Sequence, residues 1–154
     1  MAQRGFKLLL DQFASTALTI ERFNIYKAEM EAQGRRFDAA DVGVCRAFYV
    51  AKDAADKRKA VEARLSNQQR MSKLADPAGT GKSSMLSFDH TLDAAAESAM
   101  YGTPDEIAAK LERLQAAGVT HVLLNGPAGS RENLRRFAQE VMPAFVSEKR
   151  AAAE

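Results

Sequence analysis

The sequence predicts an α/β fold in which about three parallel strands alternate with amphipathic helices. Apolar runs at residues 6–10, 42–51 and 119–124 have the length of strands, and a segment with helical spacing of apolar residues follows the first two and precedes the third. Strands that are joined by helices in this way lie parallel in one sheet, with right-handed crossovers. The chain of 154 residues is long enough for one domain with a hydrophobic core.

The clearest helix–strand unit spans residues 102–125. Thr103 is placed to cap a helix, Pro104 suits the first helical position, and Glu106 completes a capping box. Gly118 ends the helix, and the apolar run that follows is expected to be a strand covered on both faces. One face of the helix carries the apolar side chains Ile107, Leu111 and Leu114.

Two helices are expected in the first half of the chain. Residues 16–33 have helical spacing, and Gly34 follows as an end signal. A second helix at residues 54–71 begins after Asp53, which is a favourable N-cap residue. Its apolar face is narrow, so we expect it to lie on the surface. The first helix buries a face made of Ile20, Phe23 and Met30, with the stem of Lys27 laid over it.

An insertion at about residues 73–100 interrupts the regular alternation of strand and helix. Residues 73–89 contain a proline, two glycines and several serines without periodicity, and are expected to form a long loop. Residues 91–100 are expected to form a short helix.

The last helix is predicted at residues 131–142, where Ser130 caps its start and Pro143 ends it. Its apolar face is expected to carry Leu134, Phe137, Ala138 and Val141. The predicted domain therefore spans residues 1–146, and residues 147–154 form a C-terminal tail.

Composition excludes several classes of protein. The net charge is +2, and basic residues are interleaved with acidic ones rather than gathered in the stripe that a nucleic-acid-binding protein needs. Cys45 is the single cysteine, so no intramolecular disulfide can form. No apolar run approaches the roughly 20 residues of a membrane span, and no signal peptide is visible at the N-terminus, so a cytoplasmic protein is expected. His90 and His121 lack a ligand spacing typical of zinc, so no metal site is predicted.

Residues 76–84, DPAGTGKSS, partly match a phosphate-binding loop. Gly81, Lys82 and Ser83 fit the motif, but Asp76 stands where the first glycine is required. The flanking residues predict neither a buried strand before the motif nor a helix after it. A glycine-rich loop is therefore favoured, and a small nucleotide-binding domain remains the less favoured alternative.

Four segments carry a resemblance to a known family. They read RGFKLLLDQF at residues 4–13, CRAFYVAKDAADKRKAVE at 45–62, YGTPDEIAAKLERLQAAGVTHVLLNGPAG at 101–129, and LRRFAQEVMPAF at 134–145. Together they resemble the C-terminal part of the bacterial-luciferase-like flavin-dependent monooxygenases. The resemblance covers residues 2–146 and the last three βα units of the family's barrel.

The resemblance implies a partial TIM (β/α)₈ barrel and a flavin-dependent oxidoreductase. Such enzymes use reduced flavin and O₂, or a deazaflavin, on a small organic substrate, which implies FMN or a deazaflavin as cofactor. The first part of the family's barrel has no counterpart here, so we expect the chain alone to lack most of the flavin site. Its unpaired strand edges predict self-association or a partner that supplies the missing strands. The alternative is a non-catalytic remnant or a half-barrel that assembles with a partner chain.

Alternation along the strands suggests which polar residues face the barrel lumen. We expect the more apolar sets of the first and last strands to face the helices, and the small residues of the middle strand to lie under a helix. Asp11 and Asn125 then end their strands at the carboxyl-terminal mouth, where barrel active sites lie. The predicted lumen residues are Lys7, Asp11, Arg46, His121 and Asn125, and the predicted cofactor-binding residues are Asp11, Arg46, Asn125 and Gly126. The alternative is that these side chains have a purely structural role. No catalytic residue is assigned from the sequence.

Overall fold

The computed structural model describes residues 1–75, 89–126 and 130–146. In these residues the chain forms one parallel sheet, and helices cover one of its faces. The long central strand β2 pairs with each of the other three strands. The strands are β1 (Leu8–Leu10), β2 (Val42–Val50), β3 (Met100–Gly102) and β4 (His121–Asn125).

The pairing of β2 changes along its length. Its first half lies between β1 and β4, with Gly43 opposite both Leu9 and His121. Its last three residues pair with β3, where Tyr49 lies opposite Tyr101. The parallel sheet confirms the predicted fold class. The strand β3 was not predicted, because a three-residue strand is too short to show alternation in the sequence.

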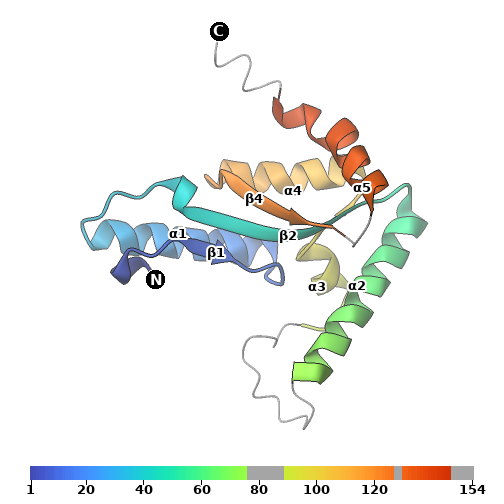
Figure 1. Ribbon diagram of the computed structural model, residues 1–154, viewed down its shortest axis with the longest axis horizontal. Coiled ribbons are helices and arrows are strands. Elements are labelled where there is room, and N and C mark those ends of the chain that lie inside the picture. Colours follow the sequence, from blue (N-terminus) through green and yellow to red (C-terminus); the bar gives the residue numbers. More distant parts are fainter. Residues whose placement is uncertain (76–88, 127–129, 147–154) are drawn as a thin grey trace.

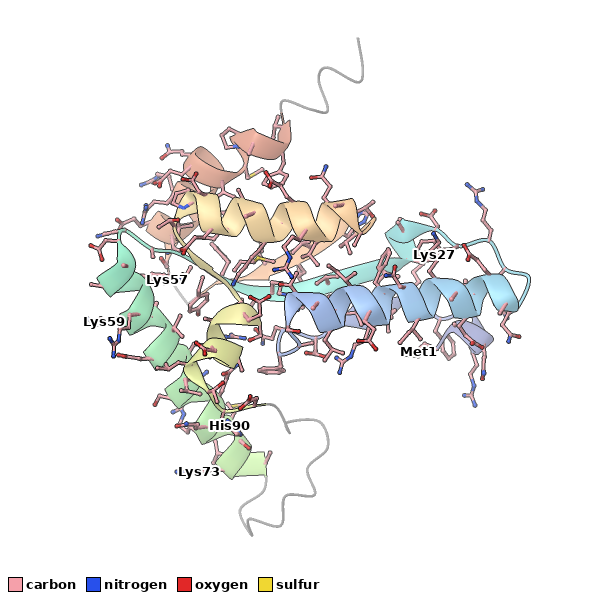
Figure 2. The ribbon with its side chains drawn as sticks, turned by 180° about the vertical axis from the view of Figure 1, so that it is seen from behind. Met1, Lys27, Lys57, Lys59, Lys73 and His90 are labelled. Atoms are coloured by element: carbon pink, nitrogen blue, oxygen red, sulfur yellow. The ribbon has the colours of Figure 1, made fainter. Side chains whose placement is uncertain are left out.

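The helices form two groups (Figure 1). The first group, α1 (Thr16–Ala32) and α4 (Pro104–Ala116), lies across one face of the sheet, as the view from behind shows (Figure 2). The second group, α2 (Ala54–Ala75) and α3 (Leu92–Glu97), lies at the carboxyl ends of the strands. The remaining elements are η1 (Ala2–Arg4), η2 (Ala39–Asp41), α5 (Arg131–Arg136) and the π-helical η3 (Phe137–Val141).

The predicted ends of α4 and the predicted start of α2 are confirmed. The Thr103 hydroxyl accepts from the Glu106 amide at 3.4 Å, and the Glu106 carboxylate accepts from the Thr103 amide at 2.9 Å. Asp53 caps α2 by accepting from the amide of Asp56 at 2.8 Å. Gly118 has a φ of 92°, a left-handed conformation that most side chains disfavour, which explains why glycine follows α4.

The hydrophobic core lies between the sheet and the helices α1 and α4. Phe23 and Ile107 are almost completely buried there, as their spacing predicted. The rings of Phe23 and Phe37 meet edge to face, with centroids 5.5 Å apart. The ammonium of Lys27 lies 5.8 Å from the centre of the Phe37 ring, so its stem covers the edge of the core as expected.

The two faces of β2 are oriented opposite to the prediction, in which the small residues lay under the helices. The face toward α1 and α4 carries the large side chains, and all of them are buried. The small residues Gly43, Cys45 and Ala47 lie on the opposite face. Large side chains are needed where two layers pack, so the helix layer decides which set turns inward. The buried set is Val42, Val44, Arg46, Phe48 and Val50.

Three further expectations were wrong in the C-terminal half. β4 was expected to be covered on both faces, but Leu123 remains 59% exposed. Leu134 was expected on the buried face of the last helix, yet it is 58% exposed, and Asn133 is buried instead. The Asn133 carboxamide accepts a hydrogen bond from the Val50 amide at 3.1 Å, which fixes the side of α5 that faces the sheet. Pro143 does not end the helical region, because residues 143–146 form a further helical turn.

Candidate functional site

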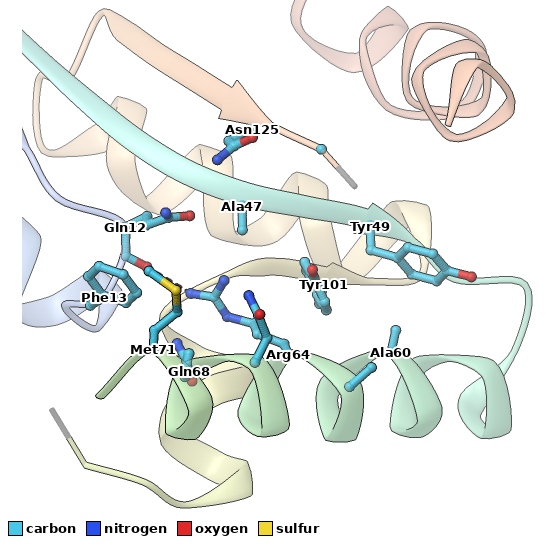
Figure 3. Close-up of a pocket in the computed structure, with 13 residues that line it drawn as sticks. Gln12, Phe13, Ala47, Tyr49, Ala60, Arg64, Gln68, Met71, Tyr101 and Asn125 are labelled. Carbon is cyan, nitrogen blue, oxygen red and sulfur yellow. Dashed lines mark hydrogen bonds between the residues drawn. The ribbon is translucent and has the colours of Figure 1, made fainter. Parts of the chain in front are cut away.

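A cleft of about 490 Å³ lies between the carboxyl ends of the strands and α2 (Figure 3). Its walls come from the loop after β1, the end of β2, the helix α2, the strand β3 and the end of β4. This is the end of a parallel α/β sheet at which ligands bind. The lining residues include Gln12, Phe13, Ala47, Tyr49, Arg64, Gln68, Met71, Tyr101, Asn125 and Gly126.

One stripe of α2 forms a wall of the cleft. The residues of this stripe recur at steps of three or four, which places them on the same side of a helix. The stripe contains small, amide and cationic side chains and few large apolar ones. This narrow apolar surface is the reason why α2 was predicted to lie on the surface. The stripe consists of Ala60, Ala63, Arg64, Asn67, Gln68 and Met71.

Arg64 is the cation that lines the cleft, and its Nε and Nη2 groups donate hydrogen bonds within the protein. Its guanidinium donates to the carbonyl oxygens of Gln12 at 2.8 Å and Ala95 at 3.2 Å, and to the hydroxyl of Ser98 at 3.3 Å. Burial lowers the pKa of Arg64, and Tyr101 partly offsets this effect. The residue therefore ties the β1–α1 loop and α3 to the helix α2.

Two tyrosines form the wall opposite α2. The rings of Tyr49 and Tyr101 lie 5.7 Å apart, and the guanidinium carbon of Arg64 lies 5.7 Å from the centre of the Tyr101 ring. Burial raises the pKa of Tyr101, while Arg64 opposes the rise. The Tyr49 hydroxyl donates to the carboxylate of Asp56 at 3.0 Å, and burial followed by this bond raises the pKa of Tyr49. Both phenols are therefore neutral hydrogen-bonding groups near neutral pH.

Two of the predicted cofactor-binding residues, Asn125 and Gly126, line the cleft. Asn125 is exposed at the end of β4 and lies opposite Ala47 of β2. A side chain on Gly126 would meet the Phe48 ring at 2.7 Å, so the chain needs glycine to turn past the sheet there. Their roles toward a cofactor stay predictions.

Asp11 lies beside the cleft without lining it. Its carboxylate accepts from the amides of Phe13 at 2.7 Å and Ala14 at 3.0 Å, and it pairs with Arg22 at 2.8 Å. Burial opposes ionisation, but these amides and the nearby guanidinium groups hold the pKa of Asp11 below its usual value. Asp11 therefore shapes the turn that presents Gln12 and Phe13 to the cleft.

The expectation that Arg46 faces the lumen with Asn125 is wrong. Arg46 is completely buried on the helix-facing side of β2. Its guanidinium donates to the main-chain oxygens of Asp11 at 2.6 Å and Cys45 at 2.9 Å, and also to the Thr19 hydroxyl of α1. Burial lowers the pKa of Arg46, with Asp11 opposing. The residue anchors the β1–α1 loop from beneath the sheet.

Lys7 and His121 lie at the amino ends of their strands, away from the cleft. Lys7 is largely exposed and pairs with Asp41 at 2.9 Å. His121 lies opposite Gly43 and has a ring nitrogen 2.9 Å from the Thr120 hydroxyl. Neither residue lines the cleft that Asn125 reaches.

Sequence reasoning missed Tyr49, Arg64, Gln68 and Tyr101 as residues of one site. Tyr101 belongs to a quoted family segment, but the strand that carries it was not recognised. The signal for α2 was its stripe of small and amide residues at helical spacing, which indicates a helix that lines a partly polar space.

Other sequence signals lead to no second site in the part of the chain that the structure describes. Residues 76–84, the partial phosphate-loop motif, lie outside it. Within the described ranges, no group of three His, Cys, Asp or Glu residues is arranged to hold a metal ion. None of the helices that can be examined is long and apolar enough to cross a membrane.

The sequence matches no protein-family model, and no curated protein proved similar to it. Solved structures, in contrast, resemble the fold. The monooxygenase RslO1 from Streptomyces bottropensis superimposes with a TM-score of 0.66 at 20% identity, over 94% of this chain and 44% of that one. The F420-dependent tetrahydromethanopterin reductase from Methanopyrus kandleri gives a TM-score of 0.57 at 17% identity, over 94% and 47%.

A third similar structure contains a flavin. It is the oxygenating constituent of 3,6-diketocamphane monooxygenase from Pseudomonas putida in complex with FMN, with a TM-score of 0.57 at 17% identity over 92% of this chain and 43% of that one. The chain spans less than half the length of these structures. Its fold is that of part of a TIM barrel, which confirms the predicted fold class.

Proposed function

We propose that the chain forms the C-terminal portion of a flavin- or deazaflavin-dependent oxidoreductase, most simply a monooxygenase that acts on a small organic substrate. The observation that carries the proposal is the cleft at the carboxyl ends of β2, β3 and β4, in a fold shared with FMN- and F420-dependent enzymes. In such barrels this end of the strands holds the active site.

The residues of the cleft fit the ring system of a flavin better than its phosphate. The walls are mostly apolar, and Tyr49, Tyr101 and Asn125 add aromatic and amide groups suited to a flat heterocycle. The cation Arg64 already donates to two main-chain oxygens and a hydroxyl. No other cation lines the cleft within the described residues. The phosphate therefore requires groups from another part of the enzyme.

The bound flavin or deazaflavin would supply the redox chemistry. The residues of this chain have a simpler role. Phe13, Ala47 and Met71 exclude water from one end of the cleft, while Asn125 offers an amide to the ligand. Because much of the barrel is supplied from elsewhere in this proposal, the isolated chain lacks activity.

A second candidate is a half-barrel that works only with a partner chain, with or without catalysis. The open face of the sheet favours it, since Leu9 is 63% exposed and Leu123 is 59% exposed. Apolar side chains on a sheet face are typical of a surface that another layer covers.

A titration with FMN, followed by flavin fluorescence with the oligomeric mass measured on the same sample, tests the proposal. Binding that weakens about tenfold in Asn125→Ala, a loss of one hydrogen-bonding amide, supports a flavin site in the cleft. His121→Ala is the matched control, because it changes the same strand at the end away from the cleft. Binding that both variants leave unchanged would place the flavin elsewhere.

A further inference from the structure

A polar side chain in the cleft wall has no partner among the described residues. Gln68 of α2 is only 5% exposed, it lines the cleft, and its Oε1 atom is buried without a hydrogen bond. Figure 3 draws it on α2 beside Arg64 and Met71. Leaving a buried acceptor unpaired is costly, so a glutamine at this position is explained if a ligand supplies the missing donor.

The lining of the cleft contains other neutral carboxamides. Gln12 and Asn125 also line the cleft, and each carboxamide presents both a donor and an acceptor. Arg64 is the cation of the lining, but its donors are directed to Gln12, Ala95 and Ser98. An anionic ligand would therefore have to share the charge of Arg64 with the main-chain oxygens and the hydroxyl to which it already donates. A neutral ligand with adjacent N–H and C=O groups would find complementary partners.

The remaining lining suits a flat and largely apolar body. Phe13, Ala47 and Met71 present apolar surface, and Tyr49 and Tyr101 present aromatic surface. Flat heterocycles with an apolar side and an imide edge combine both requirements.

We propose that Gln68 is the specificity-determining residue of the cleft, and that it accepts a hydrogen bond from the imide N–H of a neutral pyrimidinedione-type ring. This inference rests on the proposed function, which places the ring of a flavin or deazaflavin in the cleft. Both rings carry an imide edge of this kind. It goes further by assigning the recognition to Gln68 and by favouring a neutral ring over an anion as the ligand.

Binding of four small rings to the full chain tests the proposal. The probes are lumiflavin, 3-methyl-lumiflavin, lumazine and 2-naphthalenesulfonate, measured by equilibrium dialysis. Lumiflavin and lumazine carry the imide N–H, the methylated ring lacks it, and the sulfonate is a flat anion. We expect the wild-type chain to bind lumiflavin at least about tenfold more tightly than 3-methyl-lumiflavin and to bind the sulfonate weakly.

The variant Gln68→Leu should remove that tenfold difference, because the acceptor is gone. Its melting temperature should not fall, because an unpaired buried amide is replaced by an apolar group of similar size. Gln69→Leu is the matched control, since Gln69 is exposed on the next position of the same helix. It should retain the wild-type preference.

Each outcome decides between the two proposals. Equal discrimination by wild type and Gln68→Leu, or a preference for the sulfonate, overturns the role of Gln68. FMN binding that is independent of Gln68 overturns this inference and leaves the proposed function standing. Lumazine binding that depends on Gln68, without FMN binding, supports the role of Gln68 and overturns the proposed function. A chain that binds none of the rings contradicts both.

Discussion

The two faces of β2 have opposite tasks in this protein. The face toward α1 and α4 carries Val44, Arg46 and Phe48, all buried. The other face carries Gly43, Cys45 and Ala47, and at its carboxyl end Ala47 and Tyr49 reach the cleft. Bulk fills the side that packs against helices, and small size leaves space on the side where a ligand can enter. The same strand therefore builds the core and the candidate site by alternation alone.

An arginine on each side of the sheet holds the same loop. Arg46 on the buried side and Arg64 on the cleft side both donate to main-chain oxygens of the β1–α1 loop, those of Asp11 and Gln12. Two cations thus hold one wall of the cleft from opposite sides. Both guanidinium groups already donate to main-chain oxygens, so each has a structural role in holding this loop.

The largest expected difference between the faces is in stability. Phe48→Ala removes a side chain that is 4% exposed and packs against Phe137, so it should lower the free energy of unfolding by about 3–5 kcal/mol. Tyr49→Phe changes the neighbouring residue on the cleft side and should cost only about 0.5–1.5 kcal/mol, since it loses one hydrogen bond to Asp56. Urea denaturation of both variants measures this difference. Equal losses would mean that the Tyr49–Asp56 hydrogen bond contributes as much to stability as the buried ring of Phe48.

Substitution on the open face of the sheet, which carries Leu9 and Leu123, should have a smaller effect on stability. It should instead change the assembly of the protein. Leu123→Lys should alter the free energy of unfolding by no more than about 0.5 kcal/mol, because the side chain is already exposed. If this face is covered by another copy, the substitution should reduce the mass measured by light scattering. Leu134→Lys is the control, since Leu134 is equally exposed but lies on α5. A wild-type chain that is monomeric at all concentrations would contradict self-association.

A further small effect concerns α4, a helix that covers the core. The hydrogen bond from Lys57, followed by that from the Thr103 amide, holds the pKa of Glu106 below its usual value. A carboxyl whose pKa is lower in the folded state stabilises the fold above its unfolded pKa of about 4.3, and this contribution disappears as the pH falls through the folded pKa. Glu106→Gln keeps the capping box but loses the charge, so it should cost less than about 1 kcal/mol at neutral pH.

Thermal unfolding of wild type and Glu106→Gln as a function of pH checks this expectation. The two melting temperatures should converge in acid and should also approach each other in high salt, which screens the exposed Lys57–Glu106 pair. A difference that persists unchanged in acid would show that the side chain acts through packing instead.

Much of the local structure could be predicted because its signals are local. The start of α4 follows from Thr103, Pro104 and Glu106, and its end follows from Gly118, all within one stretch of chain. The strand β3 could not be predicted, because three residues carry no period and the strand exists only through its pairing with β2. The same holds for Asn133, whose burial depends on its bond to the distant Val50.

For the candidate site, the sequence placed Asn125 at the carboxyl end of its strand, because the apolar run ends there. By itself it also determined the α/β class and the helix caps. Only the tertiary structure decided that Arg46 turns toward α1, and that Arg64, Gln68 and Tyr101 meet across a cleft. Alternation fixes which residues of a strand share a face, but the packing of other elements fixes which face is buried. That choice depends on contacts between segments far apart in the chain.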